Sequence, residues 1–222
     1  MQLKSLLLDL DGTLVDTAPD MVATLNRILT KHNMPLANYN QASELVSNGA
    51  RALLDFGFQE HIKKFDINEL IDDFLTNYAD NICLESRLYD GMIDVLELCV
   101  RNNIRWGVVT NKPLELSRNL LSELQLLEEC EILLGGDSLP VKKPDPAPLL
   151  HCCMIMNLAP SECLYVGDHE RDIIAGRAAG MDTAAALWGY INEQQAPENW
   201  QANFLLNQPS GLRQLINDRI NQ

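Results

Sequence analysis

The chain has 222 residues, of which 46% are hydrophobic and 22% charged, and this length suits one large domain or a core with a smaller accessory domain. Its 31 acidic and 17 basic residues give a net charge of -14, which excludes nucleic acid and anionic membrane surfaces as favourable partners. None of the six cysteines lies in a C-x-x-C pair, and no apolar stretch reaches the roughly 18 residues that a membrane helix needs. Because no charged leader precedes a long apolar run either, we expect a cytoplasmic protein with reduced thiols.

Short apolar runs recur along the chain, and stretches with apolar residues at helical spacing separate them. Most of these runs are too continuous for strands with one exposed face, and they are typical of parallel strands covered by helices on both sides. We therefore predict an α/β fold with a doubly wound, Rossmann-like parallel sheet. The expected strands lie at 3–8, 104–109, 132–134, 164–166, 183–187 and, at the edge, 204–206.

Residues 17–86 break this alternation, because they contain no strong strand pattern. Apolar residues recur at helical spacing from 21 to 29 and again from 70 to 78. The sequence therefore predicts that residues 17–86 form a small helical cap domain. Residues 1–16 and 87–222 are then expected to form the α/β core.

Polar side chains follow several of the predicted strands at the point where each strand ends. The carboxyl ends of parallel strands meet at one edge of the sheet, where ligands bind in open α/β folds. We therefore expect these distant parts of the chain to deliver their polar groups to one site. The residues concerned are Asp9, Asp11, Thr110, Asn111, Lys143, Asp168 and Asp172.

Four of these groups are carboxylates, at Asp9, Asp11, Asp168 and Asp172. Asp9 and Asp11 are two residues apart, which points their side chains to the same side of a strand unless the turn at Gly12 redirects the second. Carboxylates this close repel one another unless a hard cation lies among them, and oxygen ligands with open positions suit Mg²⁺. The sequence therefore predicts a magnesium site made by a cluster of four carboxylates.

These motifs also match, in order, the motifs of a known superfamily. The segments "DLDGTLVDT", "VVTN", "KKPDP" and "VGDHERD" together resemble the four motifs of the haloacid dehalogenase phosphohydrolases, and the resemblance covers essentially the whole chain. The helical insert after the first motif resembles a cap of type C1. The surroundings "TLVDT", "TNKP" and "AGRAAG" resemble the phosphoglycolate phosphatase-like branch, while "SNGAR", "WGVVTNKP" and "LWGYI" resemble bacterial N-acetylmuramic acid 6-phosphate phosphatases.

The resemblance implies distinct roles for the two carboxylates of the first motif. Asp9 is expected to be the nucleophile that forms an aspartyl-phosphate. Asp11 is expected to protonate the leaving oxygen and then to deprotonate the hydrolytic water, while its backbone carbonyl contacts the metal. The implied activity is the Mg²⁺-dependent hydrolysis of a small phosphorylated metabolite by a monomer or homodimer.

The remaining motif residues are expected to hold the metal and the phosphoryl group. The resemblance implies that Asp168 is a direct Mg²⁺ ligand and that Asp172 acts on the ion through water or a hydrogen bond. It implies that Thr110, Asn111 and Lys143 hold the phosphoryl oxygens and offset their charge.

Other activities share parts of this pattern. A dehalogenase needs no metal and usually lacks the second aspartate of the first motif, so Asp11 argues against it. A phosphonatase needs a cap lysine, for which Lys31, Lys63 and Lys64 are the candidates, although the last two resemble a solvated face. A phosphosugar mutase shares every motif and stays open. A protein that keeps the fold only for binding would normally have lost one of the reacting residues, and all are present.

Two further residues bear on specificity. Arg51, in "VSNGARALL", follows a flexible glycine of the predicted cap, and we expect it either to bind a substrate carboxylate or to be an ordinary surface residue. Phosphoglycolate and N-acetylmuramic acid 6-phosphate both carry a carboxylate, so Arg51 does not separate them. His169 stands where the family commonly has Ser or Asp, and we expect it to be exposed on the surface.

Overall fold

The structure, a computed structural model, describes residues 3–192 and 194–220. Its central feature is a sheet in which these residues form six parallel strands in the order β5-β4-β1-β6-β7-β8. The strand order reverses at β1, with β4 on one side and β6 on the other. In a doubly wound fold a ligand is therefore expected at the carboxyl end of β1. The strands are β1 (Ser5–Leu8), β4 (Arg105–Val109), β5 (Ile132–Leu134), β6 (Cys163–Gly167), β7 (Asp182–Ala186) and β8 (Phe204–Leu206).

Helices cover both faces of this sheet, because its strands carry apolar side chains on both sides. Leu6 and Leu8 point into one hydrophobic cluster and Leu7 into the other, as the alternation along a strand requires. The first face packs against α5 (Met92–Arg101), α6 (Leu114–Glu123) and α9 (Pro209–Ile220). The second face packs against α7 (Ala147–Met156) and α8 (Glu170–Ala179).

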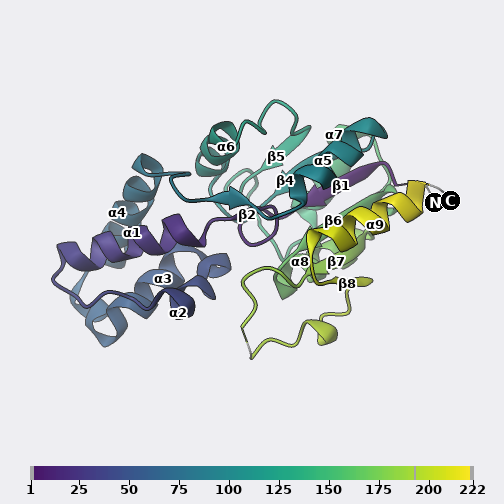
Figure 1. The fold of residues 1–222 in the computed structure, drawn as a ribbon. Coiled ribbons are helices and arrows are strands. Elements are labelled where there is room, and N and C mark those ends of the chain that lie inside the picture. Colours follow the sequence, from purple (N-terminus) through teal and green to yellow (C-terminus); the bar gives the residue numbers. More distant parts are fainter. Residues whose placement is uncertain (1–2, 193, 221–222) are drawn as a thin grey trace.

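A second group of helices lies between the first strand and the rest of the sheet in sequence, and Figure 1 shows it at the side of the sheet away from the labelled termini. We call α1 (Ala18–Lys31), α2 (Tyr39–Ser43), α3 (Gly49–Phe58) and α4 (Ile67–Asp80) the helical insert. The insert has a hydrophobic cluster of its own, which includes Phe58, Phe74 and Tyr78. Each large side chain buried there contributes roughly 1.5–3 kcal/mol, which gives the insert an internal core.

Two short strands connect the helical insert to the sheet. β2 (Val15–Asp16) pairs antiparallel with β3 (Arg87–Leu88), so the chain enters and leaves the insert through one narrow ribbon. Asp20 accepts hydrogen bonds from the backbone N–H groups of Glu85 and Ser86, each at 2.9 Å, which ties the start of α1 to the returning segment.

A tyrosine from the core fixes the other side of this connection. The Tyr190 hydroxyl accepts from the backbone N–H of Thr17 at 2.6 Å and of Ala18 at 2.8 Å, and it donates to Asp16 at 2.7 Å. Thr17 precedes α1 and gives no side-chain cap, so Tyr190 satisfies N–H groups that the first turn of a helix leaves unpaired.

The predicted α/β fold with a doubly wound parallel sheet is confirmed. The predicted strands at 132–134 and 204–206 match β5 and β8, whereas β1 begins two residues later than expected and β7 lies one residue earlier. The β2–β3 ribbon was not predicted, because strands of two residues are too short to show an alternating pattern. The limits 17–86 of the cap domain stay a prediction. Within the described residues, no helix is both long and apolar enough to cross a membrane.

Candidate active site

Three buried carboxylates meet at the carboxyl edge of the sheet. Asp9 follows β1, Asp168 follows β6, and Asp172 lies in the first turn of α8. One carboxylate oxygen from each lies within 4.8 Å of the others, and all three residues are buried. Strands β1 and β6 are neighbours in the sheet, so their ends bring together residues that are far apart in sequence.

Lys143 lies among these carboxylates and partly neutralises them. Its Nζ is 2.9 Å from Oδ1 of Asp9 and 2.7 Å from Oδ1 of Asp172, and it also donates to the Tyr165 hydroxyl at 2.8 Å. Burial acts to lower the pKa of Lys143, but the two carboxylates outweigh it and raise that pKa. The ammonium is therefore charged, and it is held against Oδ1 of Asp9, which also accepts from the backbone N–H of Leu10 at 2.8 Å.

Asp168 has an oxygen without a protein partner. Its Oδ2 accepts from Ser47 Oγ at 2.8 Å and from the Tyr190 backbone N–H at 3.0 Å, while its buried Oδ1 has no hydrogen-bond partner among the described residues. Burial, and next the charge of Asp9, raise the pKa of Asp168 to about 7. A buried carboxylate oxygen with no donor is costly, and a hard divalent cation is the group that would satisfy it. The site therefore fits a divalent metal ion.

The turn after Asp9 approaches the cluster so closely that only glycine fits. Gly12 has a φ of +82°, and a Cβ at this position would lie 2.2 Å from Oδ2 of Asp168. Both the left-handed backbone and the lack of a side chain are needed for the loop to lie against Asp168. The close approach to Asp168 thus explains why "DLDGT" has glycine at position 12.

This turn also redirects Asp11. Its Oδ1 accepts from Thr17 Oγ1 at 2.7 Å and from Lys112 Nζ at 2.8 Å, and its carboxylate is not among the three grouped carboxylates of the described residues. The expectation of a four-carboxylate cluster is therefore wrong for the Asp11 side chain. A contact between its backbone carbonyl and a metal stays a prediction.

The residues after β4 lie at the same edge of the sheet. Thr110 is buried, and its Oγ1 accepts from the Lys112 backbone N–H at 3.1 Å. The Asn111 side chain donates to the Lys143 carbonyl at 2.9 Å and accepts from the Lys143 N–H at 3.1 Å. Asn111 therefore clasps the backbone of the segment that presents Lys143, a contact that the sequence did not reveal.

Sequence reasoning also missed Lys112, which is buried and bridges the core to the helical insert. Its Nζ lies 2.8 Å from Asp11 and donates to the hydroxyl of Tyr78 in α4 at 3.1 Å. The motif "TNKP" contained the signal, but nothing in the sequence indicated that this lysine pairs with Asp11 rather than with solvent.

The segment before α3 lies against the carboxylate site. Besides the contact of Ser47 with Asp168, Arg171 of α8 donates to the Ser47 carbonyl at 2.7 Å and to Asn48 Oδ1 at 3.2 Å. Arg51, one turn further on, instead forms an ion pair with Asp55 at 2.8 Å, and 57% of its side chain is exposed. The segment between α2 and α3 thus contacts the carboxylate site through Ser47, whereas the Arg51 side chain is largely exposed.

His169 is half-buried, so the expectation that it is exposed was wrong. Its ring Nδ1 accepts from the backbone N–H of Arg171 at 3.2 Å, and the backbone N–H of His169 donates to the Asp172 carboxylate at 3.1 Å. Burial, with the neighbouring Arg171, lowers the pKa of His169 to about 4, which keeps the ring neutral. His169 therefore caps the start of α8 and helps to orient Asp172.

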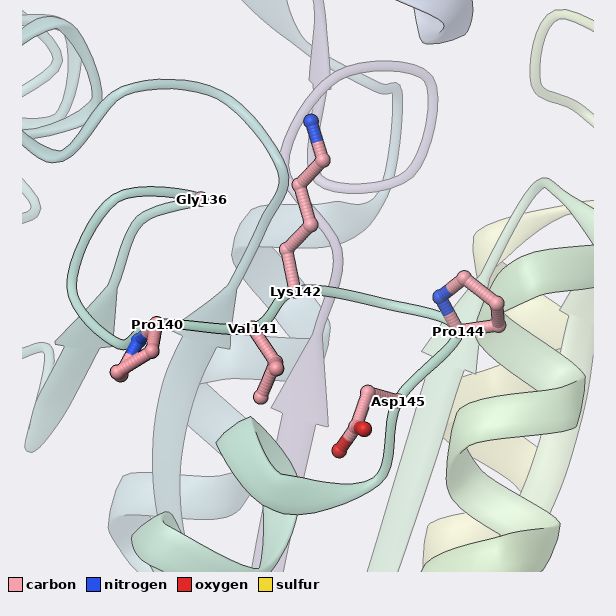
Figure 2. A pocket seen from close by; sticks show the side chains of 6 residues that line it. All are labelled: Gly136, Pro140, Val141, Lys142, Pro144 and Asp145. Atoms are coloured by element: carbon pink, nitrogen blue, oxygen red, sulfur yellow. The ribbon is translucent and has the colours of Figure 1, made fainter.

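A cavity of about 490 Å³ lies between the helical insert and the carboxyl edge of the sheet. Asp9, Asp11 and Lys143 line its core side, and apolar side chains of α4 such as Ile71 and Phe74 line the insert side. A separate hollow beside the loop at 136–145 contains none of the three grouped carboxylates. Figure 2 shows that the Lys142 side chain extends away from Val141 and Asp145 in that loop, and Lys142 also lines the carboxylate cavity.

Comparisons with known proteins identify the family of the chain. The sequence profile described as haloacid dehalogenase-like hydrolase matches residues 6–186. The chain is 41% identical to a phosphoglycolate phosphatase of Xanthomonas campestris pv. campestris (strain 8004), with 94% of each chain covered. It is 37% identical to an N-acetylmuramic acid 6-phosphate phosphatase of Pseudomonas putida, with 99% of each covered.

A solved structure extends this similarity to the fold. The crystal structure of a predicted phosphoglycolate phosphatase from Haemophilus somnus 129PT superposes with a TM-score of 0.88 at 29% identity, over 97% of this chain and 98% of that one. The chain therefore belongs to the haloacid dehalogenase-like hydrolases, and it is a phosphatase of that family.

Proposed function

We propose that this phosphatase is a Mg²⁺-dependent phosphomonoester hydrolase that works through an aspartyl-phosphate on Asp9. The observation that carries the proposal is the buried Asp9 carboxylate, 2.9 Å from Lys143 and grouped with Asp168 and Asp172. A desolvated carboxylate held by a hydrogen-bonded ammonium is oriented for attack on phosphorus, and the ammonium can contact the phosphoryl oxygens at the same time.

The reaction has two halves. In the first, an Asp9 oxygen attacks phosphorus, the P–O bond to the leaving group breaks, and Asp11 gives the leaving oxygen a proton. In the second, Asp11 takes a proton from water, the water oxygen attacks phosphorus, and the bond to Asp9 breaks with release of inorganic phosphate. Lys143, Thr110 and Asn111 hold the phosphoryl oxygens throughout, each such donor being worth roughly 2.7–4 kcal/mol.

The metal would be held by side chains already grouped in the fold. Asp9, Asp168 and the Asp11 backbone carbonyl would be its ligands, and Asp172 would act through water or a hydrogen bond. When bound, Mg²⁺ supplies positive charge that offsets the charge of the phosphoryl group and the repulsion among the carboxylates. Oδ1 of Asp168, which has no hydrogen-bond partner within the described part of the chain, supports this assignment.

The proposed substrate is a small phosphorylated metabolite that carries a carboxylate, with phosphoglycolate as the first candidate. Several relatives bear that name, at identities up to 41%. Such a dianionic phosphate needs a local positive site in a protein of net charge -14, and Lys143, Arg51 and Arg171 all line the cavity. The six free cysteines support the proposed location in the cytoplasm.

The cavity also favours a second candidate, N-acetylmuramic acid 6-phosphate. Its volume of about 490 Å³ lies in the range of sites for drug-sized ligands, and it exceeds what a two-carbon acid requires. Its insert side is apolar, with Ile71, Phe74 and Leu75 available to pack against a sugar ring and its acyl groups. The volume and the lining therefore support the larger, equally carboxylate-bearing substrate.

A phosphate-release screen tests the proposal. In Mg²⁺, we expect kcat/KM for phosphoglycolate or N-acetylmuramic acid 6-phosphate to exceed that for glucose 6-phosphate, which has no carboxylate, by roughly tenfold or more. The ratio of the first two substrates decides between the candidates. Absence of phosphate release from every phosphomonoester would reject the proposed reaction, and isomerisation of a sugar phosphate without release would indicate a mutase.

Arg51 is proposed to bind the substrate carboxylate. Among the described residues Arg51 donates from Nε to Asp55. Its terminal guanidinium nitrogens are left for a ligand in the cavity, which Arg51 lines. Arg51→Ala should lower kcat/KM for a carboxylate-bearing substrate roughly tenfold or more, and should change hydrolysis of glucose 6-phosphate little.

The control for this prediction is Arg27→Ala, an exposed arginine of α1 that is not among the cavity-lining residues. It should leave both substrates unaffected. Arg51→Lys should restore only part of the loss, because an ammonium lacks the planar fork that pairs with a carboxylate. Equal losses on both substrates in Arg51→Ala would withdraw the carboxylate role.

A further inference from the structure

Lys112 is a buried cation that connects the reacting end of the core to the helical insert. Its Nζ lies 2.8 Å from Oδ1 of Asp11 and 3.1 Å from the Tyr78 hydroxyl, and it also lies 4.4 Å from the centre of the Tyr78 ring. Only 5% of the Lys112 side chain is exposed. Its partners are 101 and 34 residues away in sequence, so the tertiary fold alone brings this contact together.

Only one of the two carboxylate oxygens of Asp11 accepts hydrogen bonds from the described residues. Both hydrogen bonds that the carboxylate accepts, from Thr17 Oγ1 and from Lys112 Nζ, fall on Oδ1. No protein donor reaches Oδ2 among the described residues, and Asp11 lines the cavity together with Asp9 and Lys143. One oxygen is therefore anchored, and the other is left to exchange a proton with a ligand in the cavity.

The anchor itself depends on the helical insert. Tyr78 belongs to α4, and it contacts Lys112 both through its hydroxyl and through the face of its ring. Burial raises the pKa of Tyr78 to about 12, so the hydroxyl stays neutral and the cation–π contact adds to the hydrogen bond. Lys112 is thus held from the insert side by Tyr78 and from the core side by Asp11.

A buried ion pair by itself is weak evidence for a role in stability, because desolvation offsets much of its attraction. A buried ion pair can still hold a side chain in one geometry, whatever it contributes to stability. Here the pair fixes the rotamer of the side chain that must deliver a proton, and a displacement of about 1 Å in such a group can cost about 100-fold in rate.

We propose that Lys112 is a positioning residue for Asp11, and that Tyr78 makes this positioning depend on the placement of the helical insert over the site. Lys112 and Thr17 hold Oδ1 of Asp11, which points Oδ2 at the leaving oxygen. When the insert moves away, Tyr78 leaves Lys112, and the proton donor loses its fixed orientation. The proposal rests on the proposed function, since it assumes that Asp11 is the proton donor.

This role predicts a dependence on the leaving group. An alkyl phosphate releases a strongly basic alkoxide and needs a proton from Asp11, whereas p-nitrophenyl phosphate releases a stable anion and does not. The ratio kcat/KM reports the steps up to formation of the phosphoenzyme, and so it isolates this first proton transfer. Replacement of a residue that only stabilises the fold would lower kcat/KM equally for both substrates.

The experiment measures kcat/KM for phosphoglycolate and for p-nitrophenyl phosphate in Lys112→Met and Tyr78→Phe. In Lys112→Met, kcat/KM should fall about 100-fold for the alkyl phosphate and less than about threefold for the aryl phosphate. Tyr78→Phe keeps the ring and removes one hydroxyl, so it should show the same selectivity with a smaller loss. Lys31→Met, which removes a cation paired with Asp73 on the exposed side of the insert, is the matched control and should change neither substrate.

The outcomes separate this proposal from the proposed function. If the wild-type protein hydrolyses both substrates and the variants lose both equally, the positioning role is rejected while the phosphatase reaction stands. If wild type releases phosphate from neither, the proposed function itself fails. Should Lys112→Met not fold, as judged by circular dichroism, Tyr78→Phe decides the matter, and an unchanged ratio of the two substrates in that variant rejects the coupling.

Discussion

Replacement of Asp9 by asparagine is expected to abolish turnover while leaving the fold intact. The amide is a poor nucleophile and cannot form the aspartyl-phosphate, whereas its size matches the carboxylate. The nucleophile is one step of a reaction whose uncatalysed rate is so low that enzymes accelerate it by up to ~10²¹-fold, so its loss should cost at least about 10⁴-fold in kcat. The measurement is phosphate release from p-nitrophenyl phosphate in Mg²⁺, together with the thermal melting curve.

A matched control is available at the other end of the sheet. Asp182 pairs with Arg219 and is not among the residues that line the cavity, so Asp182→Asn makes the same chemical change away from the site. It should retain wild-type turnover. Intact mass spectrometry of wild type quenched during turnover should show one added phosphoryl group that Asp9→Asn lacks. Wild-type turnover in Asp9→Asn would reject Asp9 as the nucleophile.

The sequence predicted the position of the site because a simple rule of parallel sheets decides it. Asp9 and Asp168 each follow a short apolar run, and the ends of adjacent parallel strands must lie at one edge. β1 and β6 are adjacent, with Leu8 opposite Val166, so the two aspartates arrive together. Each is one residue beyond a buried strand, where an unpaired carboxylate would be hard to explain without a ligand.

The Asp11 side chain shows where this reasoning stops. Spacing of two residues predicts a shared face only while the chain stays extended. Gly12, with its φ of +82°, starts a turn immediately after Asp11, and the carboxylate faces Lys112 instead of the other three. The glycine was visible in the sequence, but the direction in which its turn points the preceding side chain depends on packing against Asp168.

Contacts that depend on how the helical insert lies against the sheet could not be predicted. The Ser47 hydroxyl reaches Asp168 across 121 positions of sequence, and the Tyr190 hydroxyl reaches Thr17 across 173. Ser47 lies in a single 3₁₀ turn and Tyr190 in a loop, and neither segment has a periodic pattern that would assign the side chain a partner. Only the placement of the helical insert against the sheet gives these side chains their partners. A single sequence therefore predicted which carboxylates meet at the sheet edge better than it predicted the contacts that orient them.

Asp168→Asn is expected to weaken Mg²⁺ binding, because the amide lacks the negative charge of the buried carboxylate. The amide keeps an oxygen for the hydrogen bonds from Ser47 and the Tyr190 N–H, so the fold should persist. The loss of a charged ligand should raise the Mg²⁺ concentration needed for half-maximal activity about 100-fold or more, and excess EDTA should abolish wild-type activity. Full wild-type activity in EDTA would reject the metal-dependent reaction.

A second measurement on the same variant does not depend on activity. In EDTA, the wild-type Asp168 carboxyl has a folded-state pKa raised from 3.8 to about 7 by burial and its carboxylate neighbours, so the folded state resists ionisation that the unfolded chain undergoes freely. Wild type should therefore lose stability as the pH rises from about 4 to about 7, by up to about 4 kcal/mol, and Asp168→Asn should lose less. Added Mg²⁺ should raise the melting temperature of wild type at pH 8 and have little effect on the variant, because a ligand that binds only the folded state stabilises it. Equal stabilisation of both proteins by Mg²⁺ would show that the ion binds without Asp168.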